Sequence, residues 1–181
     1  PLLDRAIAIH DQLVGFLTQP ARSIVPLEAS IAALTALLAG VMETRAQLSR
    51  PIPIFLKIAP DLSSADLEEI ADVALAANLA GIIATNTTIG REGLEEDPAK
   101  VAEIGAGGLS GLPLQARALD VLNLLNGRLA PNQIIISVGG IETSDDAKVR
   151  LANGATLVQG YTGYIYAGPF WARKINRELA R

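Results

Sequence analysis

Lys57 is the first residue whose position suggests chemistry. It lies inside "IFLKIAP", between apolar neighbours in a short run that predicts a buried strand. A buried lysine is costly unless its charge is paired. Either its stem is buried and its ammonium group reaches solvent at the strand end, or it supplies a fixed positive charge for an anionic cofactor or a developing enolate.

A run of small polar residues, "TNTT" at 85–88, follows the apolar residues 82–84. Such a run can simply begin a turn. At the rim of a site, however, the Asn86 amide both donates and accepts hydrogen bonds, and Thr87 adds a hydroxyl group. Together these two side chains match a planar ligand that has carbonyl and N–H edges.

Two consecutive glycines, Gly139 and Gly140, end a β-branched run in "ISVGGIETSDDA" (136–147). Because glycine has no Cβ, another group can approach the backbone closely there. A tight turn, a packed neighbour or a phosphate would each explain the pair. With "GAGGLSGLPL" (105–114) and Thr162, the pair would surround a phosphate with N–H groups and a hydroxyl. Helix starts expected near 143–145 and 168–169 would add their dipoles.

The elements that must position these residues alternate along the chain. Short apolar runs predict four strands, at 52–60, 81–88, 133–140 and 156–162. Their continuous apolar character is typical of parallel strands that are covered on both faces. A loop that contains several glycines is predicted to follow the strand at 81–88 and to run to about residue 112. Helices are predicted at 27–48, 113–127, 143–154 and 168–180. A further helix is predicted to begin at an N-cap formed by Ser63 or Ser64.

Alternating strands and helices fit either an open, doubly wound sheet or a piece of a (β/α)8 barrel. No Gly-x-Gly-x-x-Gly follows the first strand, which argues against a dinucleotide-binding sheet. Barrel enzymes place their sites at the carboxyl ends of the strands and often bind phosphate after the last two. Polar residues lie at every such end here: Lys57, residues 85–88, Gly139–Gly140 and Tyr161–Thr162.

Composition narrows the classes of function. The 181 residues, half of them hydrophobic, are typical of one globular domain. The formal net charge of −4 gives no support for nucleic-acid binding. A sequence with no cysteine and the single histidine His10 offers neither a thiolate nor a multi-histidine metal site, so redox chemistry would need a borrowed cofactor. No apolar run reaches the roughly 18 residues that span a bilayer.

Five motifs, in their order and spacing, closely resemble dihydroorotate dehydrogenase: "KIAPDLS", "GIIATNTT", "GGLSGLPL", "IISVGGI" and "GATLVQGYTGYIYAGPFWARKINREL". "GLSGLPL" and "YTGYIYAGP" are similar to the class 2, quinone-linked branch. The resemblance covers about residues 27–181. It implies a (β/α)8 barrel that holds FMN non-covalently. It also implies oxidation of dihydroorotate to orotate in pyrimidine biosynthesis, with hydride passing to FMN and quinone then reoxidising the flavin.

The resemblance implies roles for individual residues by their position. Lys57 would lie beside the flavin ring and stabilise negative charge on reduced FMN, which Thr85 would also contact. Asn86 and Thr87 would hydrogen-bond the orotate ring. The FMN phosphate would be held by Gly111, Gly139, Gly140, Tyr161 and Thr162.

The sequence departs from the family pattern in its number of strands. A barrel has eight strands and typically about 250 residues, and only the last four strands are predicted here. The family's "N-x-S-x-P-N-T" segment, whose serine is the general base in class 2, is not found. Ser23 lacks the surroundings of that serine, so we assign no catalytic base. Without one, we expect a rate loss of roughly 100- to 10,000-fold.

We therefore predict an α/β fold, namely a partial (half) TIM-type barrel with four parallel strands and an extra N-terminal helix. Residues 1–22 are assigned to an amphipathic helix that we do not place in the family, and 23–181 to the C-terminal half of an FMN-binding barrel. The expected activity is dihydroorotate oxidation. The alternative is a non-catalytic half-barrel scaffold or fragment that keeps some phosphate or FMN binding.

The expected partners follow from the same features. They are dihydroorotate or orotate, a quinone acceptor and no nucleic acid. The two apolar strand edges of a half barrel predict self-association or a complementary half-barrel; the helix at 1–18 would be another cover. The expected location is the cytoplasm or the periphery of the inner membrane, since class 2 enzymes contact a membrane surface to reach quinone.

Overall fold

The computed structural model describes residues 27–181. The chain divides into two compact units, with the boundary between Ile52 and Pro53. The described part of the first unit contains α2 (Leu27–Ala46), in agreement with the helix predicted there. The helix expected at 1–18 and the domain boundary assigned at 22/23 lie outside the described residues.

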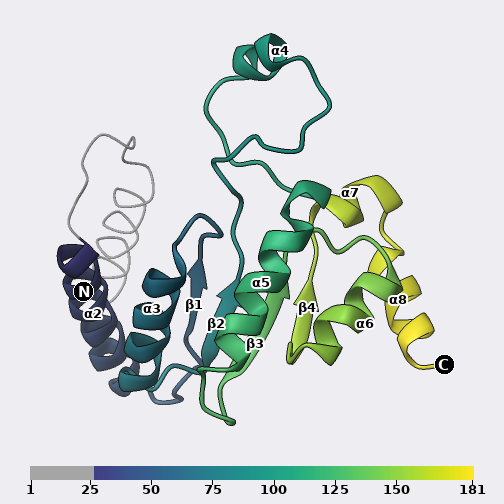
Figure 1. The fold of residues 1–181 in the computed structure, drawn as a ribbon. Coiled ribbons are helices and arrows are strands. Elements are labelled where there is room, and N and C mark those ends of the chain that lie inside the picture. The colour runs from purple at the N-terminus through teal and green to yellow at the C-terminus, as the bar shows by residue number, and fades with distance from the viewer. Residues whose placement is uncertain (1–26) are drawn as a thin grey trace. The chain divides into compact units, whose positions relative to one another are not determined.

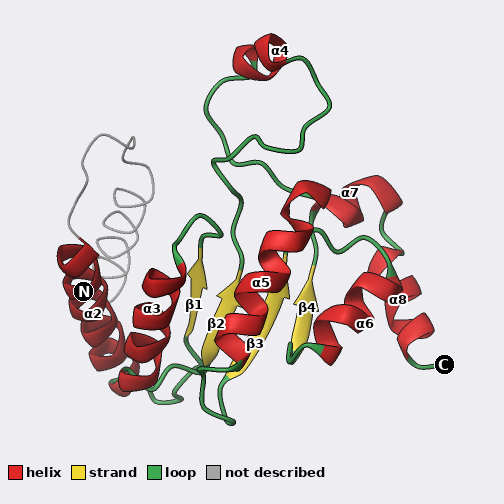
Figure 2. Ribbon diagram, in the orientation of Figure 1, coloured by secondary structure: helices red, strands yellow, loops and turns green. Residues whose placement is uncertain are grey.

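The second unit is built on one parallel sheet of four strands (Figure 1, Figure 2). The strands are β1 (Phe55–Ile58), β2 (Gly81–Ala84), β3 (Ile134–Val138) and β4 (Leu157–Gln159). Each strand pairs with the next one along the chain, so their order is β1-β2-β3-β4. A doubly wound sheet would reverse its order at a switch point. This sheet does not reverse and is not closed, which confirms the predicted half barrel.

Four helices of this unit agree with the predictions, namely α3 (Ser64–Ala76), α5 (Gln115–Asn126), α6 (Ser144–Ala152) and α8 (Trp171–Leu179). Two further short α-helices were not predicted. Asp97 caps α4 (Pro98–Glu103) within the loop predicted to reach 112, accepting a hydrogen bond from Ala99 N at 2.8 Å. α7 (Thr162–Ala167) follows β4 directly, where its aromatic and β-branched residues resemble a strand end.

The two faces of the sheet are buried to different extents. Because paired residues of parallel strands share a face, Ile58, Ala84 and Ser137 form one buried row. α5 packs on this face against β2 and β3. The adjacent row, Lys57–Ile83–Ile136–Leu157, lies on the opposite face, where Lys57 is exposed and Leu157 is 54% exposed. Within residues 53–181 only one face is therefore covered, which corrects the expectation of cover on both.

Helical spacing builds the core on the covered face. The buried residues of α3 and α5 recur at intervals of three and four, as expected for amphipathic helices that pack on a sheet. They are Leu67, Ile70, Ala71, Ala74, Ala118, Val121, Leu122 and Leu125. A second cluster joins α6 to α8 through Ile141, Ala147, Trp171 and Ile175. None of the described helices is both long and apolar enough to cross a bilayer.

The β2–β3 pairing leaves no room for a side chain at Gly81. A Cβ at this position would lie 1.8 Å from the Ile134 carbonyl oxygen, which is backbone and cannot move aside without breaking the ladder. We expect Gly81→Ala to lower the free energy of unfolding by about 2 kcal/mol, measured by urea denaturation. Gly107→Ala is the matched control, because a Cβ there meets no atom within 4 Å. Equal stability of the two variants would contradict this packing.

Candidate functional site

A cavity of about 400 Å³ opens where the four strands end. Its volume is in the range of small-molecule sites. Parallel pairing places all four carboxyl ends at one edge, so residues far apart in the sequence meet there. All nine residues predicted to bind cofactor or substrate line the cavity: Lys57, Thr85, Asn86, Thr87, Gly111, Gly139, Gly140, Tyr161 and Thr162. The wall also contains further residues of the two glycine-containing stretches quoted above, among them Gly108, Ser110, Leu114, Ile141 and Glu142, to which no individual role was assigned.

The turn after β2 is fixed by its backbone. Thr85 N donates to Val138 O at 2.8 Å, and Asn86 N donates to Ile58 O at 2.7 Å, so the turn is joined to both neighbouring strands. Thr85 is buried, and its hydroxyl donates to the Asn86 carbonyl at 3.0 Å. The side chains of Asn86 and Thr87 are exposed at the cavity. Their position is thus set by the backbone, and both residues line the cavity.

The long connection from β2 to α5 closes back on itself at its base. Thr88 N donates to Leu109 O at 3.0 Å and Leu109 N donates to Thr88 O at 2.8 Å. This bridge brings the glycine-rich stretch 105–114 beside "TNTT" (85–88). A Cβ at Gly108 would lie 1.9 Å from the Thr87 hydroxyl oxygen, so only glycine lets the loop lie this close. Thr162 Oγ1 then donates to Ser110 Oγ at 2.9 Å and joins this loop to the start of α7.

The paired glycines have a conformation and a neighbour that both require glycine. Gly139 has φ +116° and Gly140 has φ +66°, which other residues rarely adopt. A Cβ at Gly140 would lie 2.5 Å from Gln115 Cα, at the first turn of α5. A tight turn and a packed neighbour are therefore both present. The third explanation, a phosphate, stays a prediction.

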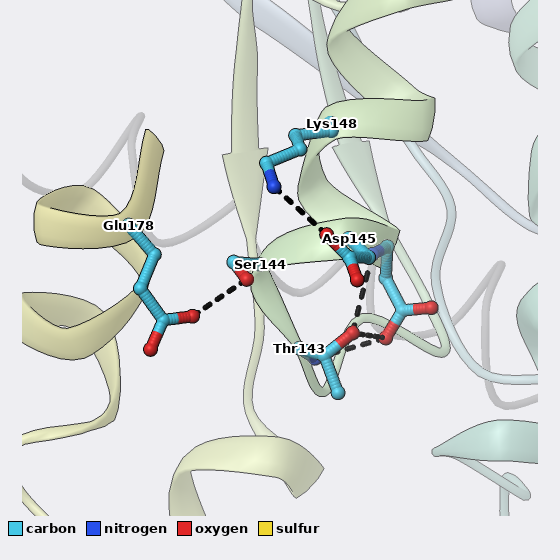
Figure 3. Close-up of polar contacts among 6 residues, drawn as sticks. Thr143, Ser144, Asp145, Lys148 and Glu178 are labelled. Carbon is cyan, nitrogen blue, oxygen red and sulfur yellow. Dashed lines mark hydrogen bonds and ion pairs between the residues drawn. The ribbon is translucent and has the colours of Figure 1, made fainter. Parts of the chain in front are cut away.

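Of the two helix starts expected near the phosphate, the one at 143–145 lies where it was predicted, and the one at 168–169 begins later. α6 begins at Ser144, but the carboxylate of Asp146 accepts hydrogen bonds from Glu142 N at 3.1 Å and Thr143 N at 2.9 Å, so these donors are already used. α8 begins at Trp171, outside the cavity wall, and it is α7 that begins at a cavity residue. Figure 3 shows the α6 start, where Ser144 Oγ donates to Glu178 of α8 at 2.6 Å.

Three polar residues that lie outside the cavity wall, Arg150, Gln115 and Asp146, were not predicted to contribute to the site. Arg150 is 1% exposed, and its Nη2 donates to the carbonyls of Gln115 at 2.7 Å and Gly139 at 2.9 Å. Gln115 Nε2 donates to Gly140 O at 3.1 Å and to Asp146 Oδ1 at 2.7 Å. The one available signal was spacing, since Arg150 follows the core residue Ala147 by three positions on α6 and so shares its face.

Comparison with known proteins agrees with the motifs. The family model for dihydroorotate dehydrogenase matches residues 25–181. The chain is 54% identical over 151 residues to a dihydroorotate dehydrogenase (quinone) of Nocardia farcinica, covering 83% of this chain and 41% of that protein. The relative from an Arthrobacter species is 48% identical over 172 residues, covering 94% and 48%. The chain thus spans less than half the length of these relatives.

Solved structures give the same result for the fold. The crystal structure of DHODH in complex with ferulenol from Eimeria tenella matches with a TM-score of 0.74 and 34% identity, covering 82% of this chain and 43% of that one. A ligand-free DHODH structure from the same organism gives a TM-score of 0.71 at 36% identity, covering 82% and 45%.

The Asp146 carboxylate makes the stability of this region depend on pH. Burial raises its pKa, but hydrogen bonds from Thr143, Glu142 and Gln115 outweigh burial and leave the pKa below its usual value of 3.8. A lowered pKa contributes stability that is complete above the unfolded value and is lost as the pH falls through the folded value.

We therefore expect Asp146→Asn to cost about 1 kcal/mol of unfolding free energy at neutral pH. The difference from wild type should shrink as the pH falls below 3.8. Urea denaturation at several pH values measures both quantities. Asp145→Asn removes the same charge one residue earlier, where the carboxylate pairs with exposed Lys148, and serves as the control. A difference between wild type and Asp146→Asn that does not change with pH would refute the assignment.

Proposed function

Because the chain belongs to the dihydroorotate dehydrogenase family, we propose that it carries the FMN-phosphate site and part of the orotate site of a quinone-linked dihydroorotate dehydrogenase. The reaction removes a hydride and a proton from dihydroorotate to give orotate, within pyrimidine biosynthesis. FMN, when bound, accepts the hydride, and quinone afterwards takes up the electrons. The observation that carries the proposal is that all nine residues suggested by the family motifs line one cavity.

The phosphate would bind between the loops that follow β3 and β4. Within residues 27–181, no acceptor is found for the backbone N–H groups of Gly139 and Gly140. Thr162 and Gly111 lie in the same wall, with the Thr162 methyl carbon 3.0 Å from where a Gly111 Cβ would stand. A phosphate has several strong acceptor oxygens, which match the backbone N–H groups that have no acceptor in this turn. Tyr161, also in this wall, is 73% exposed and available to close over the group.

The flavin ring and the orotate would lie toward β1 and β2. The exposed Lys57 ammonium group would stabilise negative charge on the reduced ring, as a fixed charge placed where charge develops. Thr85 would contact the ring from the adjacent strand end. The Asn86 amide and the Thr87 hydroxyl would hydrogen-bond the carbonyl and N–H edges of orotate. These side chains orient substrate and cofactor, but none of them is assigned as the base.

The alternative is a half-barrel that binds FMN or phosphate without turnover. The feature that favours it is the sheet, which has four strands and one uncovered face, and the family's base-bearing segment is not among the motifs found. The two functions agree on the phosphate site and differ only in whether bound flavin is reduced by dihydroorotate.

We also propose that the uncovered face is covered by a second copy of the chain or by a complementary half-barrel. Parallel sheets are almost always covered on both faces. β1 and β4 each have one neighbour within the described sheet, so both have an unpaired edge. Leu157 on β4 adds an exposed apolar side chain on the same face.

Adding dihydroorotate without oxygen to the purified, FMN-loaded chain separates the functions. For the dehydrogenase we expect the yellow colour to bleach. Lys57→Met should keep FMN but bleach roughly 100-fold more slowly, because the positive charge beside the reduced ring is lost. Lys100→Met is the matched control, since Lys100 lies on α4 outside the cavity wall. Flavin that binds and never bleaches supports the scaffold, and a chain that binds no FMN overturns the site assignment.

Sedimentation velocity over a range of protein concentrations tests whether a second copy of the chain covers the uncovered face of the sheet. We expect the wild-type chain to form dimers, and Leu157→Lys to shift it to monomers by placing a charge on the uncovered face. Val149→Lys is the control, because Val149 is similarly exposed, at 46%, but lies on α6 rather than on the sheet. A wild-type chain that stays monomeric at every concentration rules out a second copy and leaves the complementary half-barrel.

A further inference from the structure

The carbonyl groups of the glycine pair are held from behind by two side chains. Arg150 Nη2, from α6, donates to Gly139 O at 2.9 Å. Gln115 Nε2, from the start of α5, donates to Gly140 O at 3.1 Å. Neither Arg150 nor Gln115 lines the cavity, whereas both glycines do. The two carbonyls are therefore anchored on the side of the turn away from the cavity.

Peptide geometry converts these anchors into an orientation of the N–H groups. In a planar trans peptide, the carbonyl of one residue and the N–H of the next point in opposite directions. The bond from Arg150 to Gly139 O thus turns the Gly140 N–H away from Arg150. The bond from Gln115 to Gly140 O does the same for the N–H of Ile141, which also lines the cavity.

Arg150 is well suited to this task because it is a buried cation whose contacts are carbonyls. It is 1% exposed, and its Nη2 also donates to Gln115 O at 2.7 Å, so one guanidinium joins α5 to the β3–α6 turn. Its Nη1 is buried without a hydrogen-bond partner among the described residues. Burial lowers the pKa of the guanidinium, an effect that the Asp146 carboxylate opposes. An arginine remains charged in proteins, so positive charge lies beneath the turn.

Asp146 completes the network from the other side. Its Oδ1 accepts from Gln115 Nε2 at 2.7 Å, while its Oδ2 accepts from Thr143 N at 2.9 Å. The Gln115 amide is thereby fixed between a carboxylate and the Gly140 carbonyl. The orientation of both peptides thus depends on contacts among α5, α6 and the turn.

We propose that Arg150 is the positioning residue of the anion site, with Gln115, oriented by Asp146, as its second support. Arg150 acts through the Gly139–Gly140 peptide and touches no ligand. This inference rests on the proposed function, since the anion in question is the FMN phosphate. A lysine would keep the charge, but it lacks the planar fork that lets a guanidinium hold two carbonyls in a fixed direction.

Comparing FMN with riboflavin isolates the phosphate. In wild type we expect FMN to bind more tightly than riboflavin, which lacks the phosphate. In Arg150→Met this preference should fall about tenfold or more, while riboflavin affinity stays unchanged. Arg150→Lys should recover part of the preference. Ile70→Ala, a core truncation on α3, controls for general loss of stability and should keep the full preference.

A second measurement needs no ligand. The NMR order parameter of the Gly140 amide should be near 0.85 in wild type and below about 0.6 in Arg150→Met. A preference for FMN that survives Arg150→Met, or a Gly140 amide that stays rigid in that variant, would overturn the inference. If wild type does not prefer FMN, the proposed function fails instead, and the Gly140 order parameter still shows whether Arg150 fixes the turn.

Discussion

Parallel pairing of four strands in sequential order is the constraint on which the rest of the structure depends. It brings the ends of β1 to β4 to one edge, and so gathers a lysine, a polar turn, a glycine pair and a threonine that span more than a hundred residues of sequence. Hydrogen bonds from Thr85 N to Val138 O and from Asn86 N to Ile58 O carry this register past the strands into the cavity wall. No single segment forms the site, since every strand end contributes residues to the cavity wall.

The glycine pair shows how folding and binding place the same demand on a residue. Its positive φ angles and its close approach to Gln115 are sufficient reasons for glycine without any ligand. The same geometry leaves the N–H groups of the turn without an acceptor among the described residues. A side chain placed at Gly140 would thus disturb the packing of α5 as well as any anion, and loss of binding in such a variant would not separate the two effects.

Local sequence signals were sufficient to predict the strands and the position of the site. Apolar runs predicted all four strands, and Lys57, "TNTT" and the glycines were predicted at one rim, where the structure has them. The errors concern information that is not local. α7 resembles a strand end in sequence, and the uncovered sheet face depends on which strands are present. For Arg150, spacing along α6 indicates a buried position, but its partners lie on α5 and on the glycine turn, far away in the sequence.

The bridge between Thr88 and Leu109 has a consequence for the segment between them. The segment between them contains α4. Its two ends are held together by the reciprocal hydrogen bonds of the bridge and by the bond of 2.6 Å from Arg91 to the Gly107 carbonyl. Because the entropic cost of closing a loop grows only slowly with its length, residues between these joined ends can be added or removed with little effect on the ends themselves. Residues between Arg91 and Gly107 can therefore change in number and charge with little effect on the cavity wall, and this stretch is a suitable place for an inserted affinity tag.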